Sequence, residues 1–233
     1  HLIIIADPVR SKEYDFIHGK EMEEIAKVIS RHEGVFMISD EIYEHIIFEG
    51  EHVSMASFPF IYDRVITVNG VSKGYAMTGW RIGYIGAPLW IAKACNKLQG
   101  QFTSGVCSIA QRAALAALKG TGESQKEMKA AFQRRRDLVC RLLSEIKGLK
   151  VGIPQGAFYV MPDITYYLGK SDGSLTIKTS DDLAMYLLEK AHVATVGGDA
   201  FGAPDCIRIS YATSDELLVE ALKRIKNALG NLK

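Results

Sequence analysis

The sequence predicts an α/β fold, in which short buried strands alternate with amphipathic helices. One observation is a set of apolar runs of strand length, such as residues 35–38, which lack the polar alternation of a half-exposed strand. Another is the helical spacing of apolar residues at residues 22–29. The chain is also large enough to build a core, with 233 residues of which 48% are hydrophobic and 24% charged.

In the first half of the chain, helix and strand patterns follow one another closely. A helix is predicted at residues 22–29, where apolar residues recur at i, i+3, i+4 and i+7. Gly34 then introduces a strand at residues 35–38, and further strands are predicted at residues 65–68 and 82–85. Because all three strands are short apolar runs, we expect them to be buried on both faces of a parallel sheet.

The second half is predicted to be mainly helical at first and mixed afterwards. The predicted elements are helices at residues 89–98, 108–118 and 124–146, a strand at 157–161, a helix at 181–190 and a strand at 207–210. Gly148 is the expected stop of the long helix. A final helix is predicted to start at Thr213, whose hydroxyl forms a capping box with Glu216.

A short flexible break at residues 120–122 gives the predicted domain boundary. The predicted domains are therefore residues 1–121 and residues 122–233. Three consecutive arginines at residues 134–136 lie within the long predicted helix. We interpret this run as a solvated helix face rather than an anion site, because charged runs on amphipathic helices usually face water.

Charge and composition exclude several classes of partner. The chain has 28 Lys+Arg against 27 Asp+Glu, so neither nucleic acid nor an anionic membrane is expected as the main partner. The longest apolar runs, such as residues 2–6, are strand-sized, whereas a membrane span needs about 20 residues, and we expect a soluble protein without a signal peptide. Four scattered cysteines without a CxxC pair indicate a reducing, cytoplasmic setting and no metal site.

Charged and phenolic side chains follow the predicted strands. Lys73 comes soon after the strand at 65–68, on a loop with Gly and Ser, and Arg81 comes just before the next strand. Ligands in α/β proteins collect at the carboxyl ends of strands, although spacing alone also allows Lys73 and Arg81 to be ordinary surface cations. Asp40 and Tyr43 follow the strand at 35–38. An acid, a phenol, an amine and a guanidinium together suit pyridoxal 5′-phosphate, which carries a basic nitrogen, an acidic hydroxyl, an aldehyde and a phosphate.

Two segments carry a resemblance to a known family. S-D-E-I-Y at residues 39–43 and N-G-V-S-K-G-Y-A-M-T-G-W-R-I-G-Y at residues 69–84 resemble the pyridoxal-phosphate-dependent aminotransferases of fold type I, class I/II. Within that family, the chain looks most like the bacterial aspartate aminotransferase subgroup. Further resemblances lie at residues 154–159, 196–202 and 207–213. The resemblance extends from about Gly19 to the C-terminus.

The resemblance implies a fold and a set of cofactor contacts. Residues 1–121 would be the C-terminal half of a three-layer α/β/α cofactor domain, and residues 122–233 a smaller α+β domain. Lys73 would hold the cofactor as a Schiff base and move the substrate proton. Asp40 would pair with the pyridine nitrogen, and Tyr43 would donate a hydrogen bond to the ring 3′-oxygen.

The remaining implied contacts are to the phosphate and the substrate. Arg81 would bind the phosphate bidentately. Ser72 is a second phosphate candidate, with a loop-capping hydroxyl as the alternative. Arg208 would bind the substrate α-carboxylate, the alternative being an edge-strand arginine paired with Asp205. Three glycines would shape a turn near the substrate, unless they only belong to a mobile loop: Gly197, Gly198 and Gly202.

The chain also departs from the family pattern. The family has an Asn-Pro-Thr-Gly turn upstream of the aspartate, whereas Asp7 stands near the expected Asn here. The first half of the cofactor domain, with its phosphate loop and the arm that reaches the partner subunit, has no counterpart. We therefore expect the sequence to be a fragment that is weakly active or inactive by itself.

The implied function is transfer of an amino group between an amino acid, expected to be aspartate, and a 2-oxo acid such as 2-oxoglutarate. Aromatic amino acids also stay open as substrates. The resemblance further implies a homodimer. Two alternatives stay open: another fold type I reaction, such as β-elimination or decarboxylation, and an inactive remnant that binds no cofactor.

Overall fold

The structure, a computed structural model, describes residues 2–6 and 19–233 of the chain. These residues form two compact units, one made of residues 2–6 and 19–129 and the other of residues 130–233. The division falls within helix α4 (Glu123–Ser144). The domain boundary predicted between residues 121 and 122 comes just before this helix, and it stays a prediction.

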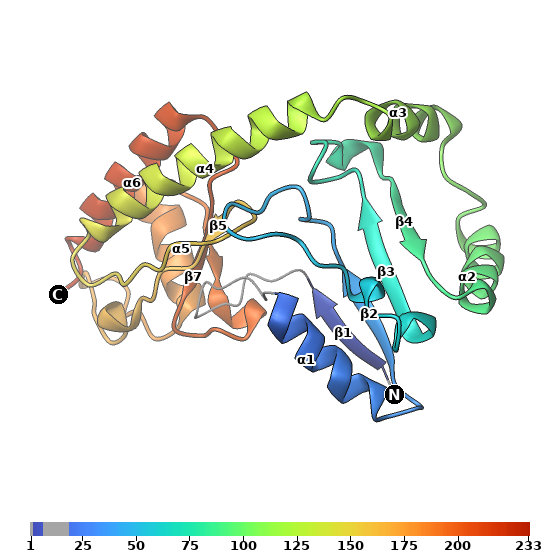
Figure 1. Ribbon diagram of the computed structural model, residues 1–233. Helices are drawn as coiled ribbons and strands as arrows, with labels where there is room; N and C mark the ends of the chain where they lie inside the picture. The colour runs from blue at the N-terminus through green and yellow to red at the C-terminus, as the bar shows by residue number, and fades with distance from the viewer. Residues whose placement is uncertain (1, 7–18) are drawn as a thin grey trace. The chain divides into compact units, whose positions relative to one another are not determined.

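The first unit is built on a four-stranded sheet (Figure 1). Its strands are β1 (Leu2–Ala6), β2 (Phe36–Asp40), β3 (Val65–Gly70) and β4 (Gly83–Gly86), in that order across the sheet. The first three are parallel, and Asp40 lies in register with Val68. The carboxyl ends of β2 and β3 therefore meet at one edge, and the predicted α/β class is confirmed.

Strand β4 corrects the prediction of a third buried parallel strand at residues 82–85. It pairs antiparallel with β3, and Tyr84 and Ile85 are exposed. A parallel return needs a crossover connection, usually a helix. The segment between β3 and β4 holds only one short 3-10 helix, η3 (Thr78–Trp80), so it closes a hairpin-like loop instead.

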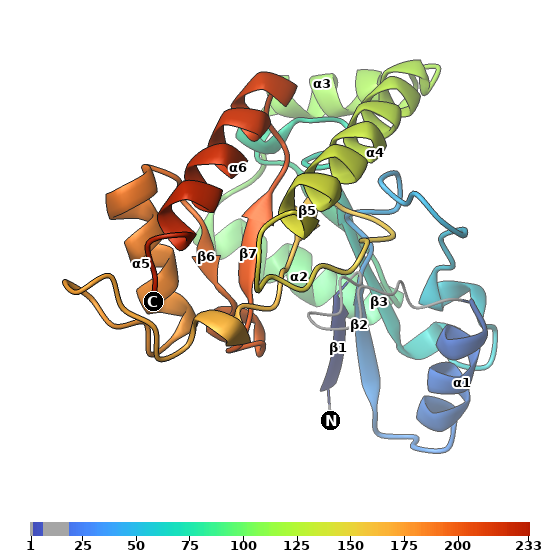
Figure 2. The same cartoon turned by 90° about the vertical axis from the view of Figure 1, so that its left-hand side faces the viewer.

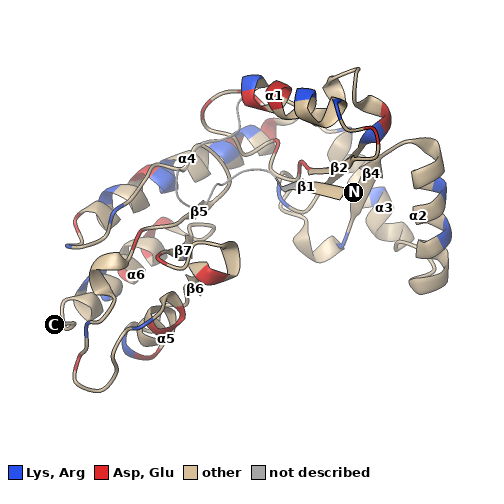
Figure 3. Ribbon diagram, turned by 90° about the horizontal axis from the view of Figure 1, so that it is seen from below, with Lys and Arg blue, Asp and Glu red and all other residues tan. Residues whose placement is uncertain are grey.

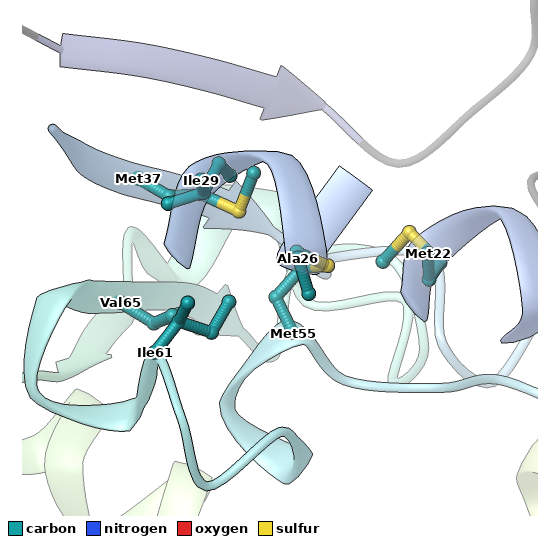
Figure 4. Packing of buried hydrophobic residues seen from close by; sticks show 7 residues of the cluster. All are labelled: Met22, Ala26, Ile29, Met37, Met55, Ile61 and Val65. Atoms are coloured by element: carbon teal, nitrogen blue, oxygen red, sulfur yellow. The ribbon is translucent and has the colours of Figure 1, made fainter. Parts of the chain in front are cut away.

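Helix α1 (Gly19–Ser30) covers one face of this sheet and forms the core of the unit (Figure 4). The predicted helical spacing is confirmed, because the helix buries Met22, Ala26 and Ile29. These side chains pack against four buried residues of the sheet and of the segment between β2 and β3: Met37, Met55, Ile61 and Val65. Burial of each large apolar side chain stabilises the fold by about 1.5–3 kcal/mol, which fixes β2 and β3 side by side.

Two further helices of the first unit are less covered. Helix α3 (Ser108–Leu118) buries Ala110 and Ala114, which belong to a small cluster with Val71 and Ile82. Helix α2 (Leu89–Phe102) buries none of its residues, and its Phe102 is 83% exposed. The described chain thus leaves an apolar helix face uncovered.

The second unit holds a small antiparallel sheet with helices beside it (Figure 2). Its strands are β5 (Tyr159–Val160), β6 (Val196–Gly197) and β7 (Ile207–Ser210), and β7 lies in the middle. Helices α5 (Ser180–Ala191) and α6 (Asp215–Leu229) pack together, and the Tyr186 hydroxyl donates to the Ala228 carbonyl at 3.0 Å. The short helices η4 (Thr165–Tyr167) and η5 (Gly198–Phe201) complete the unit.

The start of α6 differs from the predicted capping box. Ser214, not Thr213, is the N-cap residue, and its hydroxyl accepts from the Leu217 amide at 3.3 Å. Thr213 fits the T-x-x-E pattern, but Ser214 has the extended backbone that places a cap oxygen over the first turn. A complete capping box is present instead at the start of α5, between Thr179 and Asp182.

Figure 3 marks the Lys and Arg positions along α4 in blue. The sequence predicted that the three arginines at residues 134–136 face water, but one of them is buried. Arg136 is 5% exposed, donates to the Pro154 carbonyl at 3.0 Å and pairs with the Asp137 carboxylate at 2.8 Å. Arg134 and Arg135 pair with Asp215 at 3.1 and 3.0 Å. The predicted solvated face is wrong for Arg136, because a buried backbone carbonyl accepts a hydrogen bond from its guanidinium and compensates its desolvation.

Two negative findings concern the part of the chain that the structure describes. In residues 2–6 and 19–233, no helix combines the length and the apolar character that crossing a membrane requires. In the same residues, His, Cys, Asp and Glu side chains do not come together in threes or more in a way that could bind a metal ion.

Candidate functional site

The candidate site begins where β2 ends. Asp40 is the last residue of β2 and is half-buried. Its Oδ1 accepts from the Ile42 amide at 3.3 Å, and the Glu41 amide donates to the Val68 carbonyl at 2.8 Å. These two hydrogen bonds fix the end of β2, and the chain then forms a turn at residues 42–45, which contains Tyr43.

Lys73 lies on the loop that connects β3 to β4. Gly70 pairs with Gly83, and the Val71 amide donates to the Ile82 carbonyl at 3.4 Å, so the loop is closed at its base. Lys73 is half-buried within the first turn of this loop. Because β2 and β3 are parallel neighbours, Asp40 and the loop of Lys73 lie at the same edge of the sheet.

The structure brings Lys73 and Tyr43 together. The Lys73 Nζ lies 5.8 Å from the centroid of the Tyr43 ring, within the range of a cation–π interaction. An amine and a phenol from two strand ends therefore face one another. This contact joins two side chains that are 30 residues apart in the sequence and that we assigned to one site.

Arg81 lies on the same loop as Lys73 but has different neighbours. Its backbone is left-handed, with φ of 56°, and its Nη1 donates to the Thr78 carbonyl at 2.8 Å. It is exposed and lines an open cavity of about 810 Å³ with Trp80, Thr103 and Cys107. Among the described residues, Lys73 does not line this cavity.

Ser72 directly precedes Lys73 and is half-buried in the same turn. This position is compatible with both predicted roles, a phosphate contact and a loop-capping hydroxyl. Asp7, which stands near the expected Asn of the family turn, lies outside the described residues.

Arg208 lies on β7, the middle strand of the second sheet, and pairs in register with Val196. The alternative interpretation is therefore wrong in placing Arg208 on an edge strand, while its pairing with Asp205 stays a prediction. Its guanidinium carbon lies 4.1 Å from the ring centroid of Phe201 and 4.4 Å from that of Tyr159. Rings that contact the flat face of a guanidinium leave the N–H groups at its edge able to bind a carboxylate.

Two of the glycines near β6 are required by the backbone, one by close packing and one by its left-handed conformation. A Cβ on Gly198 would lie 2.1 Å from the Ala203 carbonyl oxygen, and Gly202 has φ of 70°. A side chain at either position would therefore clash or strain the backbone. Gly197 and Gly198 belong to β6 and η5 rather than to an irregular loop.

Sequence reasoning missed Glu41, which is 4% exposed. Its carboxylate accepts from the Ser54 hydroxyl at 2.8 Å and the Met55 amide at 3.3 Å, and lies 3.0 Å from His52 Nε2. Burial raises the pKa of Glu41, but the hydrogen bonds from His52 and Ser54 outweigh it, and the pKa is lowered overall. The sequence signal that could have identified Glu41 is its position directly after Asp40 at the end of a buried strand. Its hydrogen-bond partners, however, are more than ten residues away in the sequence.

Comparison with known proteins places this geometry in a family. The model of the family described as aminotransferase class I and II matches residues 16–225 of the chain. The chain belongs to this family. Its predicted membership of the class I/II aminotransferases is thereby confirmed.

Similar proteins carry aminotransferase names. The chain is 50% identical over 219 residues to a bifunctional aspartate aminotransferase and glutamate/aspartate-prephenate aminotransferase of Petunia hybrida, covering 92% of the chain and 46% of that protein. It is 48% identical over 209 residues to an aspartate/prephenate aminotransferase of Cereibacter sphaeroides, covering 88% and 52%. The chain thus spans about half the length of the curated relatives it matches.

Solved structures agree with this assignment. The crystal structure of the aspartate aminotransferase from Rhizobium meliloti superposes with a TM-score of 0.93 at 43% identity, over 100% of this chain and 58% of that one. The aromatic aminotransferase from Pyrococcus horikoshii gives a TM-score of 0.88 at 39% identity, over 99% and 60%. The chain therefore has the fold of the pyridoxal-phosphate-dependent aminotransferases over its whole described length.

The residues of the first unit fit the cofactor of this family, pyridoxal 5′-phosphate. The family's chemistry needs an amine for the aldehyde carbon and an acid for the ring nitrogen. The amine of Lys73 lies beside the phenol of Tyr43, and the carboxylate of Asp40 lies at the same sheet edge. The phosphate is an anion, and the guanidinium of Arg81 is on the loop of Lys73.

Two cysteines of this aminotransferase chain are expected to differ sharply in reactivity. The amides of Ala110 and Ile109 at the start of α3 lower the pKa of the exposed Cys107, whereas burial raises the pKa of Cys140 to about 11. The thiolate is the reactive form. Under mildly alkaline conditions, iodoacetamide should therefore label Cys107 and leave Cys140 unlabelled until the protein is denatured.

Peptide mass spectrometry of the folded chain, with the Cys107→Ser variant as a control, measures this difference. Equal labelling rates at Cys107 and Cys140 would contradict the burial of Cys140 in the second unit.

Proposed function

We propose that the chain works in an aspartate aminotransferase, which transfers the amino group of aspartate to 2-oxoglutarate with bound pyridoxal 5′-phosphate. The observation that carries the proposal is the amine of Lys73 beside the ring of Tyr43, at the sheet edge where β2 ends in Asp40. The names of the Petunia hybrida and Cereibacter sphaeroides relatives support aspartate as the amino donor. We further propose a homodimer, from the resemblance to fold type I enzymes, and a cytoplasmic location, which the free cysteines support.

The residues of the first unit would hold the cofactor. The Asp40 carboxylate would accept a hydrogen bond from the ring nitrogen and keep it protonated, and the Tyr43 hydroxyl would donate to the ring oxygen. The Arg81 guanidinium would bind the phosphate, with Ser72 as a second donor. When bound, pyridoxal 5′-phosphate supplies an electron-accepting ring that stabilises negative charge at the substrate Cα.

Lys73 and Arg208 would act on the substrate. The amine of Lys73 would take the proton from the substrate Cα as a base and return it, as an acid, to the carbon that carried the cofactor aldehyde. Arg208 would bind the α-carboxylate through the edge of its guanidinium, while Phe201 and Tyr159 hold the flat face. This would fix the Cα of the substrate relative to Arg208.

The test is a product assay on the whole protein with pyridoxal 5′-phosphate, aspartate and 2-oxoglutarate. Formation of glutamate at a rate that depends on both substrates supports the proposal. Pyruvate with ammonia would indicate β-elimination, and release of an amine with carbon dioxide would indicate decarboxylation. No product together with no visible absorbance of bound cofactor would indicate an inactive remnant.

Prephenate is a second candidate acceptor. Both named relatives act on prephenate as well as aspartate, according to their names. Replacing 2-oxoglutarate with prephenate in the same assay tests this: loss of aspartate that depends on prephenate supports the wider specificity, and unchanged aspartate rejects it.

A further inference from the structure

The turn that carries Tyr43 and the loop that carries Lys73 are joined by a second set of contacts. Asn69, near the end of β3, is 8% exposed, and its Nδ2 donates to Glu44 Oε1 at 2.7 Å. The Asn69 Oδ1 accepts from the Gly70 amide at 2.7 Å, which fixes the amide group in this orientation. The residue after Tyr43 is thus tied to the strand that leads into the loop of Lys73.

His45 and Gly74 are in close contact. A Cβ on Gly74 would lie 2.5 Å from His45 Cδ2 and 3.2 Å from both Cβ and Cγ of His45. Rotating the imidazole about its Cβ–Cγ bond would move Cδ2 but leave Cβ and Cγ in place. Rotation about the Cα–Cβ bond of His45 would swing the ring away, but it would break the ring's contact with Tyr75 and leave the His45 Cβ only 3.2 Å away. A methyl group at position 74 therefore either displaces the His45 ring from Tyr75 or moves the turn and the loop apart.

The His45 ring also packs edge-on against Tyr75, with ring centroids 5.4 Å apart and planes at 87°. Aromatic pairs in this arrangement contribute about 0.5–1.5 kcal/mol beyond their buried area. Tyr75 and Gly74 follow Lys73 directly, and His45 comes two residues after Tyr43. Each side of the contact is thus covalently close to one member of the Lys73–Tyr43 pair.

We propose that His45 and Gly74 are positioning residues, whose size-matched packing sets the place of the Lys73 amine relative to the Tyr43 ring. The functional meaning of this placement rests on the proposed aminotransferase function, but the placement itself does not. Gly74→Ala pushes the turn and the loop apart. His45→Ala removes the ring and leaves the loop without its neighbour. Combining the two changes replaces ring contact with methyl contact and returns the loop toward its original place.

The test follows Lys73 without any cofactor. Lysines of the whole protein are reductively methylated with ¹³C-formaldehyde, and the Lys73 signal in the NMR spectrum is assigned by its loss in Lys73→Arg. The ring current of Tyr43 shifts this signal, and Tyr43→Leu gives its position without the ring. Gly74→Ala should move the signal toward the Tyr43→Leu position, and Gly74→Ala with His45→Ala should move it back toward wild type.

Gly34→Ala is the matched control, because a Cβ on the exposed Gly34 meets no atom within 4 Å. Its Lys73 signal should equal that of wild type. A wild-type signal in Gly74→Ala, or a double variant no closer to wild type than Gly74→Ala, overturns the proposal.

Should Gly74→Ala fail to fold, His45→Ala and the double variant still decide the matter. The His45→Ala signal must shift, and the double variant must fold and give a signal nearer to wild type. An unshifted signal in His45→Ala overturns the proposal. A failed product assay with these shifts intact would reject the proposed function and leave the positioning role standing.

Discussion

The Lys73→Ala variant of the whole protein should lose both the visible absorbance of bound pyridoxal 5′-phosphate and the transamination of aspartate. The amine is the group on the candidate sheet edge that would bond to the aldehyde carbon and move the substrate proton. Proton transfer by a positioned side chain alone contributes a factor on the order of 10² to 10⁴. We therefore expect glutamate formation to fall by at least that factor, measured by a coupled assay alongside the absorbance spectrum.

The fold should survive this change. Lys73 is half-buried, and its cation–π interaction with Tyr43 contributes on the order of 0.5–1 kcal/mol. Lys20→Ala removes an exposed lysine of α1 and should leave absorbance and activity unchanged. Retention of the visible absorbance by Lys73→Ala would show that another amine binds the cofactor, and the site assignment would be wrong.

The sequence predicted those parts of the fold that depend on local patterns. The spacing of residues 22–29 predicted α1, because the residues on the buried face of a helix lie three or four positions apart in the sequence. The apolar runs at residues 35–38 and 65–68 predicted β2 and β3. Lys73 and Tyr43 meet because the carboxyl ends of parallel strands share one edge, which follows from topology rather than from any single residue.

The failures concern interactions between residues that are distant in the sequence. The direction of β4 depends on the absence of a crossover helix after β3, and an apolar run reads the same in either direction. In the sequence Arg136 cannot be told apart from Arg134 and Arg135, because the hydrogen bond that it donates when buried goes to the Pro154 carbonyl, 18 residues away. The packing of Gly74 against His45 has no local sequence signal at all.

Neither the sequence pattern nor the fold decides what each site residue does. Family membership is shown by the match over residues 16–225, and the structure places Lys73 beside Tyr43. Arg81 and Arg208 have their own surroundings in the first and second units. Their proposed ligands, a phosphate and a carboxylate, follow from guanidinium chemistry and from the family, so single substitutions at each have to test them.

Glu41→Gln should lower the free energy of unfolding of the first unit by about 2 kcal/mol near neutral pH, the usual size for hydrogen bonds to a charged group. Glu41 is buried directly after Asp40, and its carboxylate accepts from Ser54 and Met55 and contacts His52. The amide of glutamine can keep part of this network but offers donors where the carboxylate only accepts. The loss should therefore also loosen the turn that follows Asp40.

The effect should depend on pH in a defined direction. The folded-state pKa of Glu41 is lowered from its ordinary value of 4.5, since the bonds from His52 and Ser54 outweigh the cost of burial. A carboxyl group with a lowered folded pKa stabilises the fold above its unfolded pKa, and this contribution disappears as the pH falls through the folded pKa. The difference between wild type and Glu41→Gln should therefore be present above pH 4.5 and shrink as the pH falls further.

Urea denaturation followed by tryptophan fluorescence measures this difference. The fluorescence reports on the unfolding of the first unit, because both tryptophans, Trp80 and Trp90, lie there with Glu41. Glu33→Gln, at an exposed position on the approach to β2, is the matched control and should change the unfolding free energy by less than about 0.5 kcal/mol at any pH. A Glu41→Gln difference that grows as the pH falls below 4.5, where His52 is already charged, would mean that Glu41 is protonated in the folded protein. The carboxylate next to Asp40 would then not be the hydrogen-bonded anion that fixes the end of β2.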